Sequence, residues 1–496
     1  MITAREVALE ILYDIDVNEA YANIALDRHL RKYGPAPADR AFITEVVYGA
    51  VRYLLTLDWI IEQFFDRPVA RMTPWIHNIL RMGVYQIKYL SSVPPAVAVN
   101  EAVELAKKHG HPGTVRFVNG VLRNIARRLP DLAMPSAQTD PVEHLAVAYS
   151  HPRWLVALWL KRWGFAETAA LCAANNLSPQ LEVRANTLKI SREDLQQRFH
   201  AAGIDAQPVN FAPEGLRLHR GLDAVSAPKD GVASESRDAV ASGPKDPVLS
   251  ALEEGLCYAQ DESSMLVAHI LDPRPGEDVL DACSAPGGKT THLAQLMENR
   301  GRIVAVDDHE HKLGLVAANC ARLGIGIVQT LFADARRLGG EAIHREKYDR
   351  ILVDAPCSGL GVLRRRADAR WRKSPESLAA LPELQSAILQ SAADCLKPGG
   401  TLVYSTCTVE PAENEEVVER FLADHPDFVR EEIGSFLKGR WRWMTQDVVK
   451  EIARDGYLRL FPHRHGTDGF FAARLRKKEI QIMRRTPPFE MLHPKY

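Results

Sequence analysis

The sequence has no excess of charge of either sign. Its 496 residues include 62 Lys and Arg against 63 Asp and Glu, a formal net charge of −1. Binding to nucleic acid through overall charge is therefore excluded, and any affinity for RNA must come from local basic patches. With 46% hydrophobic and 25% charged residues, the composition is that of a globular protein of two or three domains.

Cysteine pairs and long apolar runs are also missing. The seven cysteines are odd in number, widely spread and never spaced as C-x-x-C. This argues against a disulfide framework and against a structural zinc site, so we expect no metal. No run of about 18 apolar residues is available to span a membrane. The first residues, MITAREVALEILYD, are charged early and helical in pattern, unlike a signal peptide. We expect a cytoplasmic protein with no membrane partner.

The first predicted domain, residues 1–140, has a helical pattern without strand-like alternation up to about Leu129. Apolar residues recur at steps of three and four, as at Val7, Ile11 and Ile15, which predicts an all-α bundle. A stretch rich in proline and small polar residues, 129–140, ends this domain as a linker.

One part of this bundle is basic, because residues 105–130 include no acid. A run of this kind is either a solvated helix face or a surface that neutralises phosphates. Its candidate RNA-binding residues are Lys107, Lys108, Arg123 and Arg127.

Residues 141–250 are predicted to form a small α/β (RRM-like) module. It opens with a tryptophan-rich helix, whose rings we expect to be core. Leu181–Leu188 alternates like a strand, Ser191 is placed to cap a helix, and Leu216–Leu218 is a candidate return strand. Residues 221–247 are poor in large apolar side chains and are expected to be a mobile insertion.

Residues 251–478 alternate strand-like runs with helical patterns, starting with a helix expected at Leu256–Leu271. This alternation predicts βαβ units and a Rossmann-like parallel sheet. Residues 479–496 are expected to be a disordered basic tail. The strand-like runs are Asp278–Ala282, Arg302–Asp307, Ile327–Phe332, Arg350–Asp354 and Thr401–Ser405.

The stretch Val279–Thr290, VLDACSAPGGKT, is a strand, a glycine turn and a helix start in that order. Such a turn presents backbone N–H groups and a positive helix end to a ligand. A Walker A loop requires glycine where Cys283 stands, and a dinucleotide fingerprint requires G-x-G-x-x-G. The loop of an S-adenosylmethionine methyltransferase is the third interpretation, and the loop alone does not choose among them.

Acids and cysteines follow the predicted strands. Asp307 ends the second strand about where a ribose-binding carboxylate stands in such folds. YDRILVDAPCS ends with Asp354 and Cys357, and TLVYSTCT ends with Cys407. Because ligands lie beyond the carboxyl ends of parallel strands, these side chains are predicted to share one site.

The two cysteine motifs, DAPCS and STCT, resemble those of the RNA 5-methylcytosine methyltransferases. Over its whole length the chain resembles the ribosomal RNA small-subunit methyltransferase B family. DRAF at 39–42, NEAV at 100–103 and FVNG at 117–120 resemble the NusB-type RNA-binding bundle at the front of that family, which favours the phosphate-binding interpretation of the basic run. HRHGTDGFF at 463–471 is similar to its closing motif.

This resemblance implies S-adenosylmethionine as cofactor and a role for each residue. Cys407 is the expected nucleophile and Cys357 the residue that assists product release. Asp307 is expected to hold the ribose and Asp334 to lie by the adenine, whereas Asp354 faces the cytosine. The full set of expected cofactor-binding residues is Cys283, Ser284, Ala285, Pro286, Gly287, Gly288, Lys289, Asp307, Asp334 and Asp354.

A second basic run follows Cys357 directly. It includes Arg364, Arg365 and Arg366, which are predicted to hold RNA phosphates near a flipped base. Trp371, in the same run, either stacks on a base or packs inward.

The expected function is cytosine-5 methylation of small-subunit (16S) ribosomal RNA by a monomer. One alternative is a transfer RNA cytosine-5 methyltransferase. Another is a non-catalytic RNA-binding or antitermination factor with a decayed enzyme domain, against which the intact cysteines and acids argue.

Overall fold

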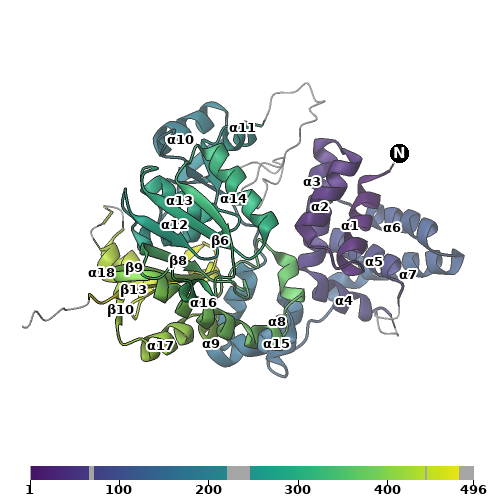
Figure 1. The fold of residues 1–496 in the computed structure, drawn as a ribbon. Coiled ribbons are helices and arrows are strands. Elements are labelled where there is room, and N and C mark those ends of the chain that lie inside the picture. Colours follow the sequence, from purple (N-terminus) through teal and green to yellow (C-terminus); the bar gives the residue numbers. More distant parts are fainter. Residues whose placement is uncertain (1, 66–71, 220–245, 439, 442–443, 480–496) are drawn as a thin grey trace, which may run out of the picture.

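The computed structural model describes residues 2–65, 72–219, 246–438, 440–441 and 444–479. A helical N-terminal domain, a small antiparallel module and a large α/β domain follow one another along the chain (Figure 1). The predicted insertion up to residue 245 and the predicted tail from residue 480 lie outside the described residues. In the described parts of the chain, none of the helices combines the length and apolar character needed to cross a membrane.

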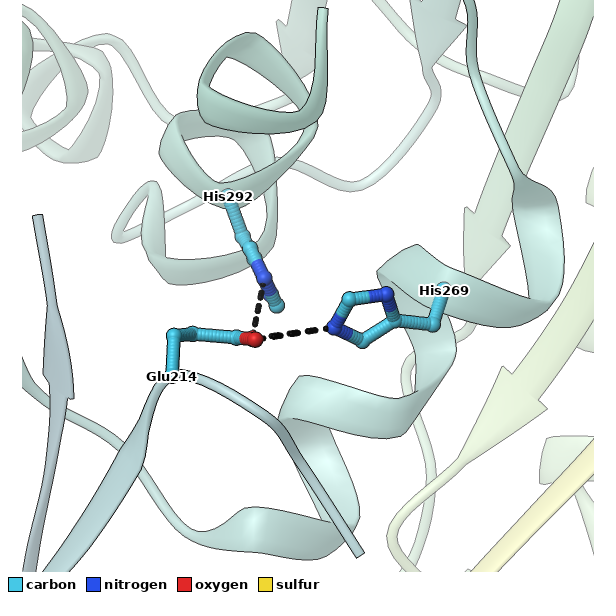
Figure 2. A group of neighbouring side chains, drawn as sticks. All are labelled: Glu214, His269 and His292. Carbon is cyan, nitrogen blue, oxygen red and sulfur yellow. Dashed lines mark hydrogen bonds and ion pairs between the residues drawn. The ribbon is translucent and has the colours of Figure 1, made fainter. Parts of the chain in front are cut away.

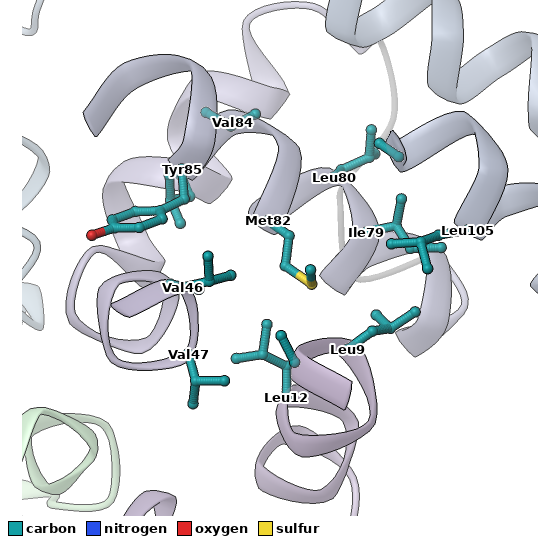
Figure 3. Packing of buried hydrophobic residues seen from close by; sticks show 14 of the residues in the cluster. Leu9, Leu12, Val46, Val47, Ile79, Leu80, Met82, Val84, Tyr85 and Leu105 are labelled. Carbon is teal, nitrogen blue, oxygen red and sulfur yellow. The ribbon is translucent and has the colours of Figure 1, made fainter. Parts of the chain in front are cut away.

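The regular secondary structure in the described residues of the N-terminal domain is all helical, as predicted. Apolar side chains of the other helices pack around helix α5, and Leu12, Val46 and Met82 are among the residues of this core (Figure 3). Helix α1 begins at a capping box formed by Thr3 and Glu6. The helices are α1 (Ala4–Asp16), α2 (Ala22–Tyr33), α3 (Pro37–Arg52), α4 (Leu54–Glu62), α5 (Pro74–Tyr89), α6 (Pro95–His109) and α7 (Pro112–Arg128).

Two helices, α8 (Pro141–Tyr149) and α9 (Arg153–Ala174), connect this domain to the rest. Trp159 of α9 is fully buried and donates its indole N–H to Glu410 Oε1 at 3.0 Å. Its neighbours include Leu360 and Leu363 of the α/β domain. Trp159 is therefore core, as predicted for the tryptophan-rich helix, and α9 fastens to the α/β domain.

The module is a four-stranded antiparallel sheet in the order β2-β3-β1-β4. One prediction is wrong here: Cys257–Ala259 is a strand, because it completes the sheet beside β1, and the helix begins only at Glu262 after its cap Asp261. The elements are β1 (Leu181–Ala185), α10 (Arg192–Ala201), β2 (Asp205–Pro208), β3 (Gly215–His219), α11 (Pro247–Glu253) and β4 (Cys257–Ala259).

The α/β domain is built on a nine-stranded sheet. Five parallel strands in the order β9-β8-β5-β6-β7 form one side of it, with β7 at the edge, and β13 pairs antiparallel with β9. The strand order reverses between β5 and β8, which is where such sheets bind ligands. The strands are β5 (Asp278–Asp281), β6 (Arg302–Asp307), β7 (Val328–Phe332), β8 (Tyr348–Asp354), β9 (Leu396–Thr406), β10 (Phe428–Glu431), β11 (Ala453–Arg454), β12 (Tyr457–Leu460) and β13 (Phe470–Lys477).

Helices cover both faces of this sheet (Figure 1). They are α12 (Glu262–Leu271), α13 (Gly288–Leu296), α14 (Glu310–Leu323), α15 (Pro375–Ala379), α16 (Leu381–Cys395), α17 (Glu415–Asp424), α18 (Ile433–Leu437), α19 (Gln446–Ile452) and α20 (Pro462–His465).

The N-terminal domain docks on the α/β domain through the 3₁₀ turn Ala367–Trp371. Ala367 joins the core of the helical domain, and Trp371 donates its indole N–H to the carbonyl of Val51 at 2.7 Å. Of the two alternatives for Trp371, the structure supports inward packing.

Candidate active site

The loop after β5 is held by β6 and by helix α14. Ser284 N–H donates to Val306 O on β6 at 2.8 Å, and Asn319 of α14 donates to Pro286 O at 2.9 Å. Gly287 has φ +100°, and a Cβ there would lie 3.2 Å from the Val316 backbone, so only glycine suits this turn. Helix α13 begins directly after it.

The buried carboxyl of Asp281 links the start of the loop to helix α13. Asp281 is 0% exposed and accepts a 2.7 Å hydrogen bond from the Thr290 hydroxyl on α13. Burial raises the pKa of Asp281 to about 7, against the opposing effect of the Thr290 hydrogen bond.

Three further carboxylates follow β6, β7 and β8. Asp307 accepts from the backbone N–H groups of Ala285 at 3.3 Å and of His309 at 3.0 Å. Asp334 is held by Arg336 at 2.7 Å. All lie at the carboxyl edge of the parallel strands, as the sequence predicted.

Asp354 ends β8 between two partners. Lys289 Nζ lies 2.7 Å from one carboxylate oxygen, and Ser405 Oγ donates to the other at 2.8 Å. Burial alone would lower the pKa of Lys289, but Asp354 outweighs it and raises that pKa. Lys289 is therefore a fixed cation, 5.0 Å from the ring centroid of Phe470.

The thiols of Cys357 and Cys407 lie 3.3 Å apart, sulfur to sulfur, and both are half-buried. They follow β8 and β9, neighbouring parallel strands in which Asp354 is opposite Ser405. The hydrogen bond from Cys357 lowers the pKa of Cys407, which burial and Asp354 oppose and the positive Lys289 assists. The same hydrogen bond and burial raise the pKa of Cys357 well above its usual range. Of the two, Cys407 is the better thiolate.

The remaining thiols are poorer nucleophiles. Burial raises the pKa of Cys283 well above its ordinary value, and the surrounding acids raise it further. The other four, Cys172, Cys257, Cys320 and Cys395, are buried, and burial raises the pKa of each to about 11 or 12.

Comparison with known proteins covers all three structural units. Family models match residues 2–127 (NusB family), 151–224 (RsmF/B-like methyltransferase, ferredoxin-like domain) and 268–476 (16S rRNA methyltransferase RsmB/F). A probable ribosomal RNA small subunit methyltransferase B of Bacillus subtilis is 39% identical over 96% of this chain and 99% of its own length. A relative of the same name from Synechocystis is 40% identical over 96% and 100%.

The chain belongs to the ribosomal RNA small subunit methyltransferase B family. Its fold class is as predicted: a helical NusB domain, a ferredoxin-like module and an α/β methyltransferase domain. The crystal structure of PH0851 superposes with a TM-score of 0.75 at 27% identity, covering 96% of this chain and 99% of its own. NSun6 from Pyrococcus horikoshii, solved with SFG, has a TM-score of 0.53 at 28% identity and covers 66% of this chain and 98% of its own.

The arginines of the basic run after Cys357 differ in their partners. Arg364 is 9% exposed and donates to Asp468 at 2.5 Å and to Asp261 at 3.0 Å. Arg365 binds the same two carboxylates, each at 2.6 Å. These two guanidinium groups are therefore held in ion pairs with buried carboxylates, whereas Arg366 is exposed and close enough to lower the pKa of Cys407. Phosphate binding by the three arginines stays a prediction.

The basic residues of the NusB domain are exposed. Lys107 pairs with Glu104 at 2.6 Å and Lys108 with Glu6, so acids offset part of the charge on α6. Arg123 and Arg127 lie on the exposed face of α7. RNA binding by these four residues stays a prediction.

A buried cluster joins the ferredoxin-like module to the methyltransferase domain. Glu214 Oε1 lies 2.6 Å from His292 Nε2 and 3.0 Å from His269 Nε2 (Figure 2). Two ligands of one zinc ion would lie about 3.3 Å apart. The 2.6 Å spacing is shorter than that, and the two histidines stabilise the charge of Glu214, whose pKa they lower well below its ordinary value against the opposing effect of burial. The cluster is better described as a junction between domains than as a metal site.

Sequence reasoning missed three buried polar residues behind the thiols, Gln385, Glu413 and Asn414. In VEPAENEE, residues 409–416, the acids look like the solvated start of a helix. The sequence contains no signal that Glu413 and Asn414 are buried.

Proposed function

We propose that this protein is an S-adenosylmethionine-dependent RNA (cytosine-5)-methyltransferase that forms 5-methylcytosine in 16S ribosomal RNA through a covalent Cys407 adduct. The observation that carries the proposal is the pair of thiols 3.3 Å apart at the ends of neighbouring strands, beside Asp354 and Lys289. Membership of the methyltransferase B family supports the substrate class.

The strand ends fit the cofactor. Helix α13 presents its N-terminal backbone N–H groups beside Gly287, which suits a carboxylate. Asp307 accepts two backbone N–H groups, and a carboxylate has further lone pairs for ribose hydroxyls. Asp334 is assigned to the adenine side, and residues 283–289 to the methionine end. The bound cofactor supplies an electrophilic methyl group.

Carbon-5 of cytosine is not nucleophilic, and the cysteines solve this problem. The Cys407 thiolate adds to carbon-6, so carbon-5 becomes enamine-like and takes up the methyl group. A base then takes the carbon-5 proton, the electron pair of that bond re-forms the carbon-5–carbon-6 double bond, and Cys407 leaves carbon-6 as the thiolate. Cys357 donates a hydrogen bond that favours the Cys407 thiolate, and it assists this elimination.

Asp354 is assigned to the cytosine itself. It ends β8 next to both thiols, and Lys289 and Ser405 fix its orientation. A carboxylate there can accept from the exocyclic amine of cytosine, which uracil lacks. That contact orients the ring for attack at carbon-6.

The alternatives differ in substrate or in activity. The NusB domain at the front favours ribosomal over transfer RNA, and the lowered pKa of Cys407 argues against a decayed enzyme. Incubation with methyl-labelled cofactor and bare 16S RNA, assembled small subunits or transfer RNA separates the three. We expect label in 5-methylcytosine of 16S RNA. Label only in transfer RNA, or none in any RNA, would overturn the proposal.

A further inference from the structure

The backbone on both sides of Cys357 is held by buried side chains. Gln385 Nε2 donates to Pro356 O at 3.0 Å, and Ser358 N–H donates to Glu413 Oε2 at 2.8 Å. Gln385 Nε2 also lies 3.0 Å from the same Glu413 oxygen, so the two anchors are joined. Glu413 is 1% exposed and Gln385 0%. These buried hydrogen bonds thus fix the backbone on both sides of Cys357.

Asn414, the residue after Glu413, holds the chain on both sides of Cys407 in a similar way. Thr406 Oγ1 donates to Asn414 Oδ1 at 2.5 Å, and Asn414 Nδ2 donates to Thr408 O at 3.1 Å. Thr406 and Thr408 are the neighbours of Cys407 on either side, and both are fully buried.

The two cysteine loops are also linked to each other. Ser358 Oγ and Thr408 Oγ1 share a 2.7 Å hydrogen bond, and Thr408 Oγ1 lies 3.3 Å from Glu413 Oε1. A connected buried network of this kind holds one geometry, because each broken link leaves a polar group without a partner.

We propose that Glu413 and Asn414 are positioning residues for the reaction, and that together they hold the thiols of Cys357 and Cys407 within hydrogen-bonding distance. Neither residue touches the substrate in this assignment, and both act through the thiols. The inference rests on the proposed two-thiol function for its purpose, but its geometry stands on the contacts of the two loops.

The proposal implies that the pKa of Cys407 depends on how Glu413 and Asn414 hold the two cysteine loops. A displacement of about 1 Å is enough to cost reactivity in a preorganised site, and it would take the sulfur atoms from 3.3 Å to beyond hydrogen-bonding distance. Cys407 would then lose the donor that favours its thiolate, and its pKa would rise toward that of an ordinary buried thiol.

The test is the pH dependence of alkylation at Cys407 in the full chain, measured with iodoacetamide and assigned by peptide mass spectrometry. Cys357→Ala removes the donor itself and should raise the midpoint by about one pH unit. Glu413→Ala should raise the midpoint as much as Cys357→Ala does. The double variant Cys357→Ala/Glu413→Ala should raise it no further. Glu413→Gln, whose amide oxygen can still accept from Ser358 N–H, should restore most of the wild-type midpoint.

Glu416→Ala is the matched control, because Glu416 is an exposed acid in the same acidic segment, and its midpoint should match wild type. Should Glu413→Ala fail to fold, Gln385→Leu breaks the same link and should raise the midpoint. A wild-type midpoint in folded Glu413→Ala, or additive shifts in the double variant, would overturn the inference. The measurement uses neither RNA nor methyl transfer, so failure of the proposed function would be seen separately.

Discussion

Replacing Arg364 tests whether the ion pairs of the basic run stabilise the fold or leave the run free to bind RNA. The variant Arg364→Met removes donors to Asp468, Asp261 and the Gly466 carbonyl. Both carboxylates are less than one-tenth exposed and would keep only Arg365 as cation. Removing one partner from a buried ion pair costs about 3–5 kcal/mol of folding free energy. Denaturant unfolding followed by tryptophan fluorescence should report a loss of this size.

The neighbouring Arg366 supplies the matched comparison because it is exposed. Arg366→Met should reduce the slope of log affinity for RNA against log salt by about 0.7–0.9, the share of one phosphate contact. Arg364→Met should keep the wild-type slope. A stable Arg364→Met protein with a flatter salt dependence would refute the ion-pair role and restore the phosphate-binding interpretation.

Two further predictions concern the cofactor side of the site. Asp307→Ala should weaken binding of S-adenosylmethionine by about 1.5–3 kcal/mol in calorimetry, because hydrogen bonds to a charged acceptor are lost; unchanged affinity would remove Asp307 from the site. Asp281 ionises near pH 7 when folded but near pH 4 when unfolded. Ionisation of the Asp281 carboxyl therefore lowers the free energy of unfolding as the pH rises from about 4 to about 7, by up to about 4 kcal/mol. Asp281→Asn should be more stable than wild type at pH 8 but not at pH 4, and an equal difference at both pH values would contradict this.

Much of the methyltransferase domain was predictable because its signals are local. A parallel strand buried on both faces is an apolar run, and a residue that ends it must lie at the ligand edge. The sequence alone therefore predicts that Asp307, Asp354, Cys357 and Cys407 share one edge of the sheet. Their distances and partners depend on the register between β8 and β9, which no local pattern encodes.

The features that the sequence did not reveal come from contacts between distant segments. Arg364 and Arg365 look like a phosphate-binding run because their partners, Asp261 and Asp468, lie about one hundred residues away on either side. The strand Cys257–Ala259 looked helical because its pairing with β1 is not visible in its own sequence. In each case tertiary pairing overrode the local pattern.

The most direct test of the proposed chemistry is to trap the RNA adduct. In the Cys357→Ala variant, Cys407 should still attack the ring and the methyl group should still be transferred, but the product should not be released. The variant should therefore give a band shifted by covalently bound 16S RNA in denaturing electrophoresis, with Cys407 as the linked residue in mass spectrometry. Cys357→Ala/Cys407→Ala must lack the band, and Cys320→Ala, which removes a buried thiol of α14, should behave as wild type. A shifted band from Cys407→Ala, linked through Cys357, would contradict the assignment of Cys407 as the nucleophile.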